Sequence, residues 1–214
     1  IGTEHARNLK KAFQQSLSFM KSDCLYGLLV HHADDLLSQN AQYLYEAMLT
    51  LKNAGLVKKI GVSVYDSEQI DNIVSRFDID IVQVPVNLLD QRLIQSGHLR
   101  SLKQKGIEIH ARSVFLQGLL LMQPDELPDF FEPVRIHLKK FHEDCVRYGS
   151  KPLGVCLDFV LGLTEIDRVI VGVCSTNELR EILRALSHKN TFPENFSRYA
   201  WQDKAILNPA MWKY

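Results

Sequence analysis

The sequence predicts an α/β fold with parallel strands, and three observations support that prediction. Short apolar runs such as "LYGLLV" alternate along the chain with amphipathic stretches of helical period. The connections between them are short, as expected when parallel strands are covered by helices. No GxGxxG follows an apolar run and no GxxxxGK[ST] occurs, which disfavours an open nucleotide-binding sheet. Together these observations favour a (β/α) barrel over a doubly wound sheet.

Five strands are expected, each apolar and each followed by a helical pattern: residues 25–30, 58–64, 79–85, 107–113 and 167–173. The run at 25–30 does not alternate, so we expect it to be buried on both faces. A first helix of about 15 residues is expected from the apolar spacing between Leu9 and Met20. Further helices are expected at residues 38–54, 67–77, 97–106, 130–148, 152–162 and 176–186.

Composition sets limits on function and location. The 214 residues are 46% hydrophobic and 23% charged, and 25 basic residues balance 25 acidic ones. No net field attracts nucleic acid or an anionic membrane, and no apolar run could span a bilayer. Four scattered cysteines without a CxxC pair favour reduced thiols in a cytoplasmic protein. We expect a single domain over residues 1–214 that lacks its N-terminal part, because the chain begins with Ile1 and enters a helix almost at once.

In a barrel of this kind, chemistry is performed at the carboxyl ends of the strands. Polar residues that follow the expected strands are therefore candidates for a site: His31, Ser63, Gln83, Arg112 with Ser113, and Cys174 with Ser175. Arg112 suits a phosphate or a planar ring, although a surface arginine is the alternative. Three further cysteines are expected to be core or partly buried residues: Cys24, Cys145 and Cys156.

The segment "HHADD" at residues 31–35 has three readings. His31 could donate to a carbonyl oxygen or shuttle a proton, because imidazole titrates near neutral pH. With His32 and the two aspartates it could instead bind a metal. The third reading is a strand-end histidine, with the aspartates capping the next helix. Neighbouring strand residues point to opposite faces, so we expect His31 to face the reaction centre, His32 to point away, and no structural metal.

Five segments resemble, in order, those of the aldo/keto reductase family: "LYGLLVHHADDL", "AMLTLKNAGLVKKIGVSVYDSEQI", "DIVQVPVNLLDQR", "GIEIHARSVFLQGLLL" and "PLGVCLDFVLGLTEIDRVIVGVCSTNELREIL". The matches cover roughly residues 5–185. The resemblance implies a (β/α)8 TIM barrel, incomplete here with about five of eight strands. It also implies NADP(H)-dependent reduction of a small aldehyde or ketone, with no metal and with NAD(H) as the other candidate cofactor.

The resemblance also assigns roles to individual residues. His31 would orient the substrate carbonyl, and Ser63 and Gln83 would hold the nicotinamide carboxamide. Arg112 falls where many members place a tyrosine that stacks on the nicotinamide. The loop that wraps the pyrophosphate would include Ser113, Phe115 and Gln117. The adenosine end would be held by Cys174, Ser175, Glu178 and Glu181.

Three departures from the family pattern limit what the resemblance implies. Val64 replaces an asparagine beside the nicotinamide, and "GVCSTNELREI" lacks the basic residue commonly used on the 2′-phosphate. The family's catalytic aspartate, tyrosine and lysine precede the histidine strand, so we expect the chain alone to be inactive. A tyrosine needs such partners to donate a proton at neutral pH.

Two other functions stay open. One is a non-catalytic barrel that binds nucleotide or a protein partner, as channel-associated members of the family do. The other is a barrel enzyme that uses "HHADD" for metal chemistry. Another chain could close an open barrel, so a homo-oligomer is a further expectation.

Overall fold

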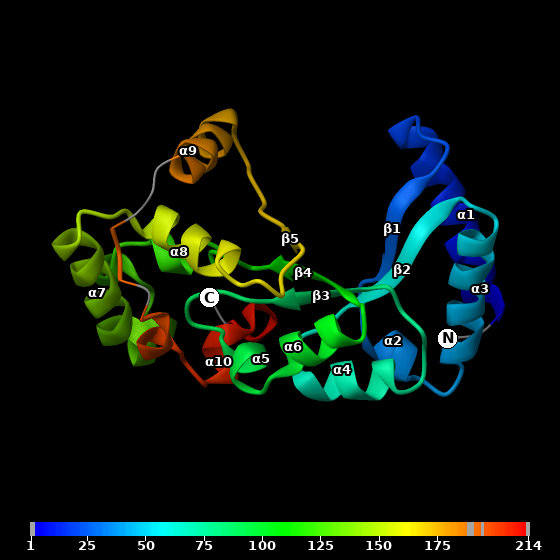
Figure 1. Cartoon of the computed structure of the whole chain (residues 1–214), viewed down its shortest axis with the longest axis horizontal. Coiled ribbons are helices and arrows are strands. Elements are labelled where there is room, and N and C mark those ends of the chain that lie inside the picture. The colour runs from blue at the N-terminus through cyan, green and yellow to red at the C-terminus, as the bar shows by residue number, and fades with distance from the viewer. Residues whose placement is uncertain (1–2, 188–190, 194, 213–214) are drawn as a thin grey trace. The chain divides into compact units, whose positions relative to one another are not determined.

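A computed structural model describes residues 3–187, 191–193 and 195–212 (Figure 1). Its five strands form one sheet in chain order, β1-β2-β3-β4-β5. The chain divides into two compact units, which are described separately. Unit 1 comprises Ile1–Val84 and Arg100–His110, and unit 2 comprises Pro85–Leu99 and Ala111–Tyr214. The expectation of a single domain over residues 1–214 stays a prediction.

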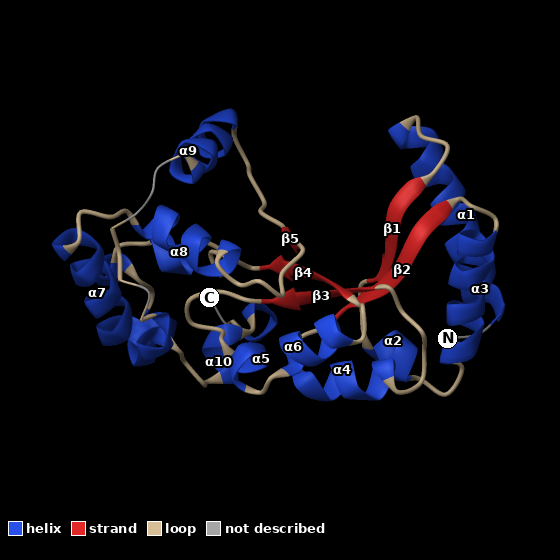
Figure 2. Cartoon of the chain, in the orientation of Figure 1, coloured by secondary structure: helices blue, strands red, loops and turns tan. Residues whose placement is uncertain are grey.

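Most of unit 1 consists of parallel strands and the helices that follow them (Figure 2). Its elements are α1 (Thr3–Met20), β1 (Leu25–Val30), α2 (Asp34–Leu37), α3 (Ala41–Asn53), β2 (Val57–Ser63), α4 (Ser67–Val74) and β3 (Ile81–Pro85). Strands β1 and β2 are parallel, as are β2 and β3. Two elements, α6 (His98–Gln104) and β4 (Glu108–Arg112), have residues in both units, and β3 enters unit 2 at Pro85.

Unit 2 is richer in helix and loop. Its elements are α5 (Arg92–Gln95), η1 (Leu119–Leu121), η2 (Pro124–Glu126), η3 (Asp129–Phe131), α7 (Glu132–Arg147), α8 (Pro152–Leu161), β5 (Arg168–Val169), α9 (Thr176–Leu186), η4 (Phe196–Tyr199), α10 (Lys204–Leu207) and η5 (Pro209–Met211). Helix α9 packs against α8, and α8 also contacts η1. These contacts place the start of α9 and the loop after β4 in one compact unit.

Local sequence explains where several helices begin. The carboxylate of Asp66 accepts a hydrogen bond from the Gln69 amide at the start of α4, as an N-cap residue does. Pro152 opens α8, where its missing N–H costs nothing. Helix α3 buries Leu44, Met48 and Leu51 on one face, as its helical period predicts.

The α/β fold with parallel strands is confirmed, and the main helices begin and end close to the predicted residues. The expected strand at 167–173 is shortened to β5, two residues long. The prediction that "LYGLLV" is buried on both faces is wrong: within β1 only Val30 is buried, and Tyr26 is 42% exposed. The reason is that β1 lies at the end of the strand order and, among the described residues, pairs only with β2.

The cysteines divide into two groups. Cys145 and Cys156 are buried, as expected, and burial raises the pKa of the Cys145 thiol to about 12. The prediction for Cys24 is wrong, because it lies in the turn before β1 and is exposed. Within the described ranges, no helix is both long enough and apolar enough to cross a bilayer.

Candidate functional site

Three predicted site residues lie at the carboxyl ends of neighbouring strands in unit 1. Ser63, the last residue of β2, is the register partner of Gln83 in β3. The Ser63 hydroxyl donates to Oε1 of Gln83 over 3.4 Å, and the Val64 amide donates to the Gln83 carbonyl over 2.9 Å. His31 follows Val30, the last paired residue of β1. The register therefore brings Ser63 and Gln83 together, as the sequence predicts for two strand-end residues.

The expected orientation of the two histidines is wrong. Their ring centroids lie only 4.7 Å apart, edge to face, and both residues are exposed. The reason is that His31 and His32 lie beyond the end of β1, where the alternation of a strand no longer applies. Asp34 lies in the first turn of α2 and accepts a hydrogen bond from Gln69. In the described part of the chain, no three His, Cys, Asp or Glu residues form a group that could hold a metal.

Unit 2 contains a cavity of about 1400 Å³ that collects most of the remaining candidates. Seven of the predicted cofactor-binding residues line it: Arg112, Ser113, Phe115, Gln117, Cys174, Glu178 and Glu181. They come from two segments that are distant in sequence: the end of β4 with the loop after it, and the start of α9 with the residue just before its N-cap. Ser175 is not among the lining residues of this cavity.

The loop after β4 has an unusual backbone. Ser113, Leu116 and Gln117 have φ values of 60°, 46° and 54°, and Gly118 has a φ of 89°. Only glycine adopts this left-handed region without cost, and another residue pays roughly 1–2 kcal/mol there. Such conformations persist when the surrounding structure enforces them, and they occur often at binding sites.

The start of α9 is fixed by its own side chains. The Ser175 hydroxyl accepts a hydrogen bond from the Glu178 amide, and the Glu178 carboxylate accepts one from the Cys174 amide. This reciprocal arrangement resembles a capping box and satisfies two backbone donors at once. It holds the Glu178 carboxylate against the backbone at the helix start. The role of Ser175 toward a cofactor stays a prediction.

The cavity is large and carries charges of both signs. Two basic residues that the sequence analysis missed, Lys151 and Arg184, line it together with Arg112, Glu178 and Glu181. Lys151 directly precedes Pro152, the first residue of α8. A basic residue just before a helix that begins with proline was the sequence signal that could have identified Lys151 as a candidate. Donors, cations and the Phe115 ring in one cavity fit a ligand that combines phosphates with planar rings. A dinucleotide has that chemistry.

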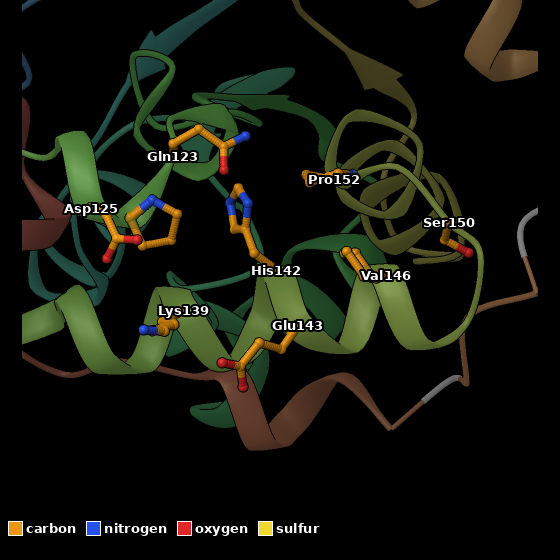
Figure 3. A pocket seen from close by; sticks show the side chains of 10 residues that line it. Gln123, Asp125, Lys139, His142, Glu143, Val146, Ser150 and Pro152 are labelled. Carbon is orange, nitrogen blue, oxygen red and sulfur yellow. The ribbon is translucent and has the colours of Figure 1, made fainter.

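A second cavity, of about 430 Å³, is lined by α7, by η2 and by the residue before η2, and it shares Gln123 and Pro152 with the first. Figure 3 shows His142 projecting from α7 toward Gln123. The His142 ring donates from Nε2 to the Leu120 carbonyl, and burial lowers the pKa of this histidine while that bond partly offsets the effect. His142 thus ties α7 to η1, the segment that follows the left-handed loop.

A polar cluster in unit 1 is the other concentration of titratable groups. The Glu108 carboxylate, 9% exposed, accepts hydrogen bonds from Tyr26 at 2.6 Å, from His110 at 2.7 Å and from Lys59. Burial alone would raise the pKa of Glu108, but these three donors more than offset it and hold that pKa well below its usual range. The hydrogen bond between Lys59 and Glu108 also raises the pKa of Lys59.

Comparisons with known proteins agree with this architecture. The chain is similar to the aldo-keto reductase AKR11C1 from Bacillus halodurans, with a TM-score of 0.71 for its holo form at 19% identity. That alignment covers 99% of this chain and 70% of the other. The apo form gives a TM-score of 0.70 at 20% identity, with 97% of this chain and 71% of that chain covered.

A third solved structure is similar at the same level. It is the thermostable aldo-keto reductase Tm1743 with the inhibitor epalrestat, with a TM-score of 0.66, 20% identity, and 90% and 65% of the two chains covered. No curated protein sequence matches the chain. The profile of the Aldo/keto reductase family, however, matches residues 3–199. The chain therefore belongs to the aldo/keto reductase family of oxidoreductases, and its five parallel strands are part of that family's (β/α)-barrel fold.

Proposed function

We propose that the chain supplies the dinucleotide-binding part of a reductase that converts a small aldehyde or ketone to an alcohol with NADP(H), or alternatively with NAD(H). The observation that supports this most directly is the cavity in unit 2, which seven predicted cofactor residues line. The name of the holo structure of AKR11C1 is consistent with a bound group in a related protein. Cytoplasmic location stays a prediction, as does formation of a homo-oligomer.

The residues of this chain would bind the dinucleotide and orient the substrate carbonyl. A reduced nicotinamide supplies a hydride when it is bound. Ser63 and Gln83 offer a hydroxyl and an amide at paired positions, which suits the carboxamide of such a ring. His31 would donate a hydrogen bond to the substrate carbonyl oxygen and polarise it toward attack. Arg112 and Lys151 would pair with the phosphates.

The acidic residues of the cavity bear on which dinucleotide binds. Glu178 and Glu181 lie on the first turns of α9, and the Glu178 carboxylate is held there by the Cys174 amide. A ribose 2′-phosphate near these groups would be repelled, whereas a 2′-hydroxyl could donate to them.

The test is a titration of the full chain with NADPH and with NADH, in which binding is measured by isothermal calorimetry or nicotinamide fluorescence. We expect saturable binding of at least one dinucleotide, and Glu181→Gln should strengthen NADPH binding by about two- to tenfold while changing NADH binding less. Asn53→Ala, an exposed change in unit 1, serves as a control. Absence of binding to either dinucleotide would sink the proposal. Binding without turnover of an aldehyde would agree with the proposal, because we expect the chain alone to be inactive.

A further inference from the structure

The left-handed loop that lines the large cavity is tied to a buried turn before α5. Residues 85–99 and 111–214 belong to the same unit, and Asn87 lies in the turn that follows β3. The Asn87 side chain is fully buried, and its Nδ2 donates to the Ser113 carbonyl over 3.1 Å. Ser113 is the first residue of the loop with positive φ.

We propose that Asn87 is a positioning residue, which holds Ser113 in its left-handed conformation and so sets the course of the cavity-lining loop. The inference rests on the proposed function only where it concerns cofactor affinity. Asn87 is not among the lining residues of the cavity, so it would act through Ser113 rather than on a ligand.

The orientation of the Asn87 amide follows from its partners. Oδ1 accepts hydrogen bonds from the amides of Leu89 at 3.0 Å and Asp90 at 2.9 Å. Two backbone donors on one side require the oxygen there, so the NH₂ group has to face the Ser113 carbonyl. Every direction in which the amide could turn would leave a buried donor or acceptor unpaired.

The Ser113 carbonyl is the atom group through which Asn87 contacts the loop. It accepts from Asn87 and also from the Leu116 amide at 2.9 Å, which closes the first turn of the loop. The preceding carbonyl, of Arg112, accepts from the Val86 amide at 3.1 Å. Two consecutive carbonyls at the loop entrance are therefore fixed by two consecutive residues, 86 and 87.

The consequence reaches the side chains that line the cavity. Arg112 donates from Nη1 to the Ser113 hydroxyl over 3.1 Å, so the position of Ser113 affects the guanidinium as well. If the Ser113 carbonyl lost its side-chain donor, Ser113 could relax toward negative φ, which L-residues prefer. The loop would then leave the course that brings both side chains into the cavity.

Gln91 provides a matched control in the same turn. Its side chain is also buried, at 4% exposure, and its Nε2 donates to the carbonyls of Leu88 and Phe196. Neither partner belongs to the loop after β4. Gln91→Ala should therefore remove a comparable number of buried hydrogen bonds without releasing Ser113.

The experiment compares Asn87→Ala, Asn87→Asp and Gln91→Ala in the full chain by amide hydrogen exchange and dinucleotide titration. We expect both Asn87 variants to accelerate exchange of the Leu116, Gly118 and Leu119 amides by about tenfold, the effect of one lost hydrogen bond. Dinucleotide affinity should fall by a similar factor, and Gln91→Ala should change neither. Asn87→Asp keeps the acceptor for Leu89 and Asp90 but replaces the donor with a carboxylate oxygen, which repels the Ser113 carbonyl, so it tests the idea if the alanine variant fails to fold.

A rescue distinguishes positioning from a general structural role. Glycine adopts the φ of Ser113 without cost, so Ser113→Gly added to Asn87→Ala should recover most of the lost exchange protection. Unchanged exchange of these amides in both Asn87 variants, or equal acceleration in Gln91→Ala, would overturn the inference. Hydrogen exchange needs no cofactor, so a parent chain that binds no dinucleotide would contradict the proposed function while the exchange data still decide whether Asn87 holds the loop.

Discussion

Glu108 is the carboxylate on which three side chains from three strands converge. Tyr26 lies in β1, Lys59 in β2 and His110 beside it in β4, so the cluster ties the strands of unit 1 together through one charged acceptor. Charge-assisted hydrogen bonds of this kind are stronger than neutral ones, and their loss leaves a partly buried charge without its partner.

We predict that Glu108→Gln lowers the free energy of unfolding by about 1–3 kcal/mol at pH 7. The pKa of Glu108 is lowered in the folded state, so its contribution is full above the unfolded value of 4.5 and is lost as the pH falls toward the folded value. Urea unfolding between pH 7 and pH 3 should therefore show a steeper loss of stability for the parent than for the variant. Glu68→Gln, an exposed change of the same charge, is the control, and equal pH slopes for the parent and Glu108→Gln would contradict the prediction.

The site residues that could be predicted from the sequence and those that could not differ in their position along the strands. Ser63 and Gln83 could be predicted to lie close together because each is a polar residue near the carboxyl end of an apolar strand, and parallel strands end at the same edge. The Glu108 cluster could not be predicted, because its members lie within strands 82 residues apart and no local pattern marks which faces meet. The contact of His31 with His32 was missed because strand alternation was extended past Val30.

At the level of elements, Gly61 fixes how closely β2 and β3 approach. It is the register partner of Ile81, and a Cβ built on Gly61 would lie 2.0 Å from the Ile81 carbonyl oxygen. Backbone cannot yield as the end of a side chain can, so only glycine fits at this position. The strand pair therefore depends on one missing methyl group.

We predict that Gly61→Ala lowers the free energy of unfolding by more than about 3 kcal/mol, or prevents folding of unit 1, because the two strands would have to separate. Gly172→Ala is the matched control, since a Cβ at Gly172 would meet no heavy atom within 4 Å. Chemical denaturation followed by circular dichroism measures both variants. A loss of less than 1 kcal/mol in Gly61→Ala would show that the strands are not held at this spacing.

Element boundaries were predictable where the periodicity is long. Helices α3, α7, α8 and α9 lie within a few residues of their predicted ranges, because each has an amphipathic or apolar face of several turns. The apolar run at 167–173 looked the same as the other strands, yet only β5 forms, because hydrogen-bonded neighbours decide where a strand ends. The short helices α2, α5 and α10 span four residues each and carry too little periodicity to be predicted.

At the scale of a whole unit, the C-terminal segment closes the core of unit 2. The Trp201 amide donates to the Leu89 carbonyl, and the Phe196 carbonyl accepts from Gln91. The Tyr199 hydroxyl donates to the buried Asp144 carboxylate over 2.7 Å, and burial raises the pKa of that tyrosine. One segment near the chain's end thus contacts both the turn before α5 and helix α7.

We predict that deletion of residues 195–214 abolishes cooperative unfolding of unit 2, because Asp144 loses Tyr199 and Arg198, the carbonyl of Leu89 loses its donor, and the core on α7 is uncovered. Tyr199→Phe keeps the ring and removes one hydroxyl, so it should cost about 1–2 kcal/mol. The effect of both variants is measured by the hydrogen exchange of the α7 backbone amides. Protection of α7 equal to the parent in the deletion variant would mean that α7 is stable without this segment.

The family and the barrel class could be predicted for the whole molecule, because collinear motifs extend over most of the chain. For the cavity, seven of the lining residues could be predicted from the sequence, but the packing that brings them together could not. Its lining joins two distant segments with Lys151 and Arg184, and the packing of α8 against α9 brings them together.

The same C-terminal segment gives the protein an optical property. The sequence has two tryptophans, Trp201 and Trp212, and both belong to unit 2. Their rings lie 5.2 Å from His137 and 4.8 Å from Phe131, so indole emission senses the surroundings of α7 and η3. Unit 1 contributes no indole at all, whereas the helices of both units contribute to circular dichroism. Following emission and ellipticity in one denaturant series would reveal, without any label, whether the two units melt as one or in succession.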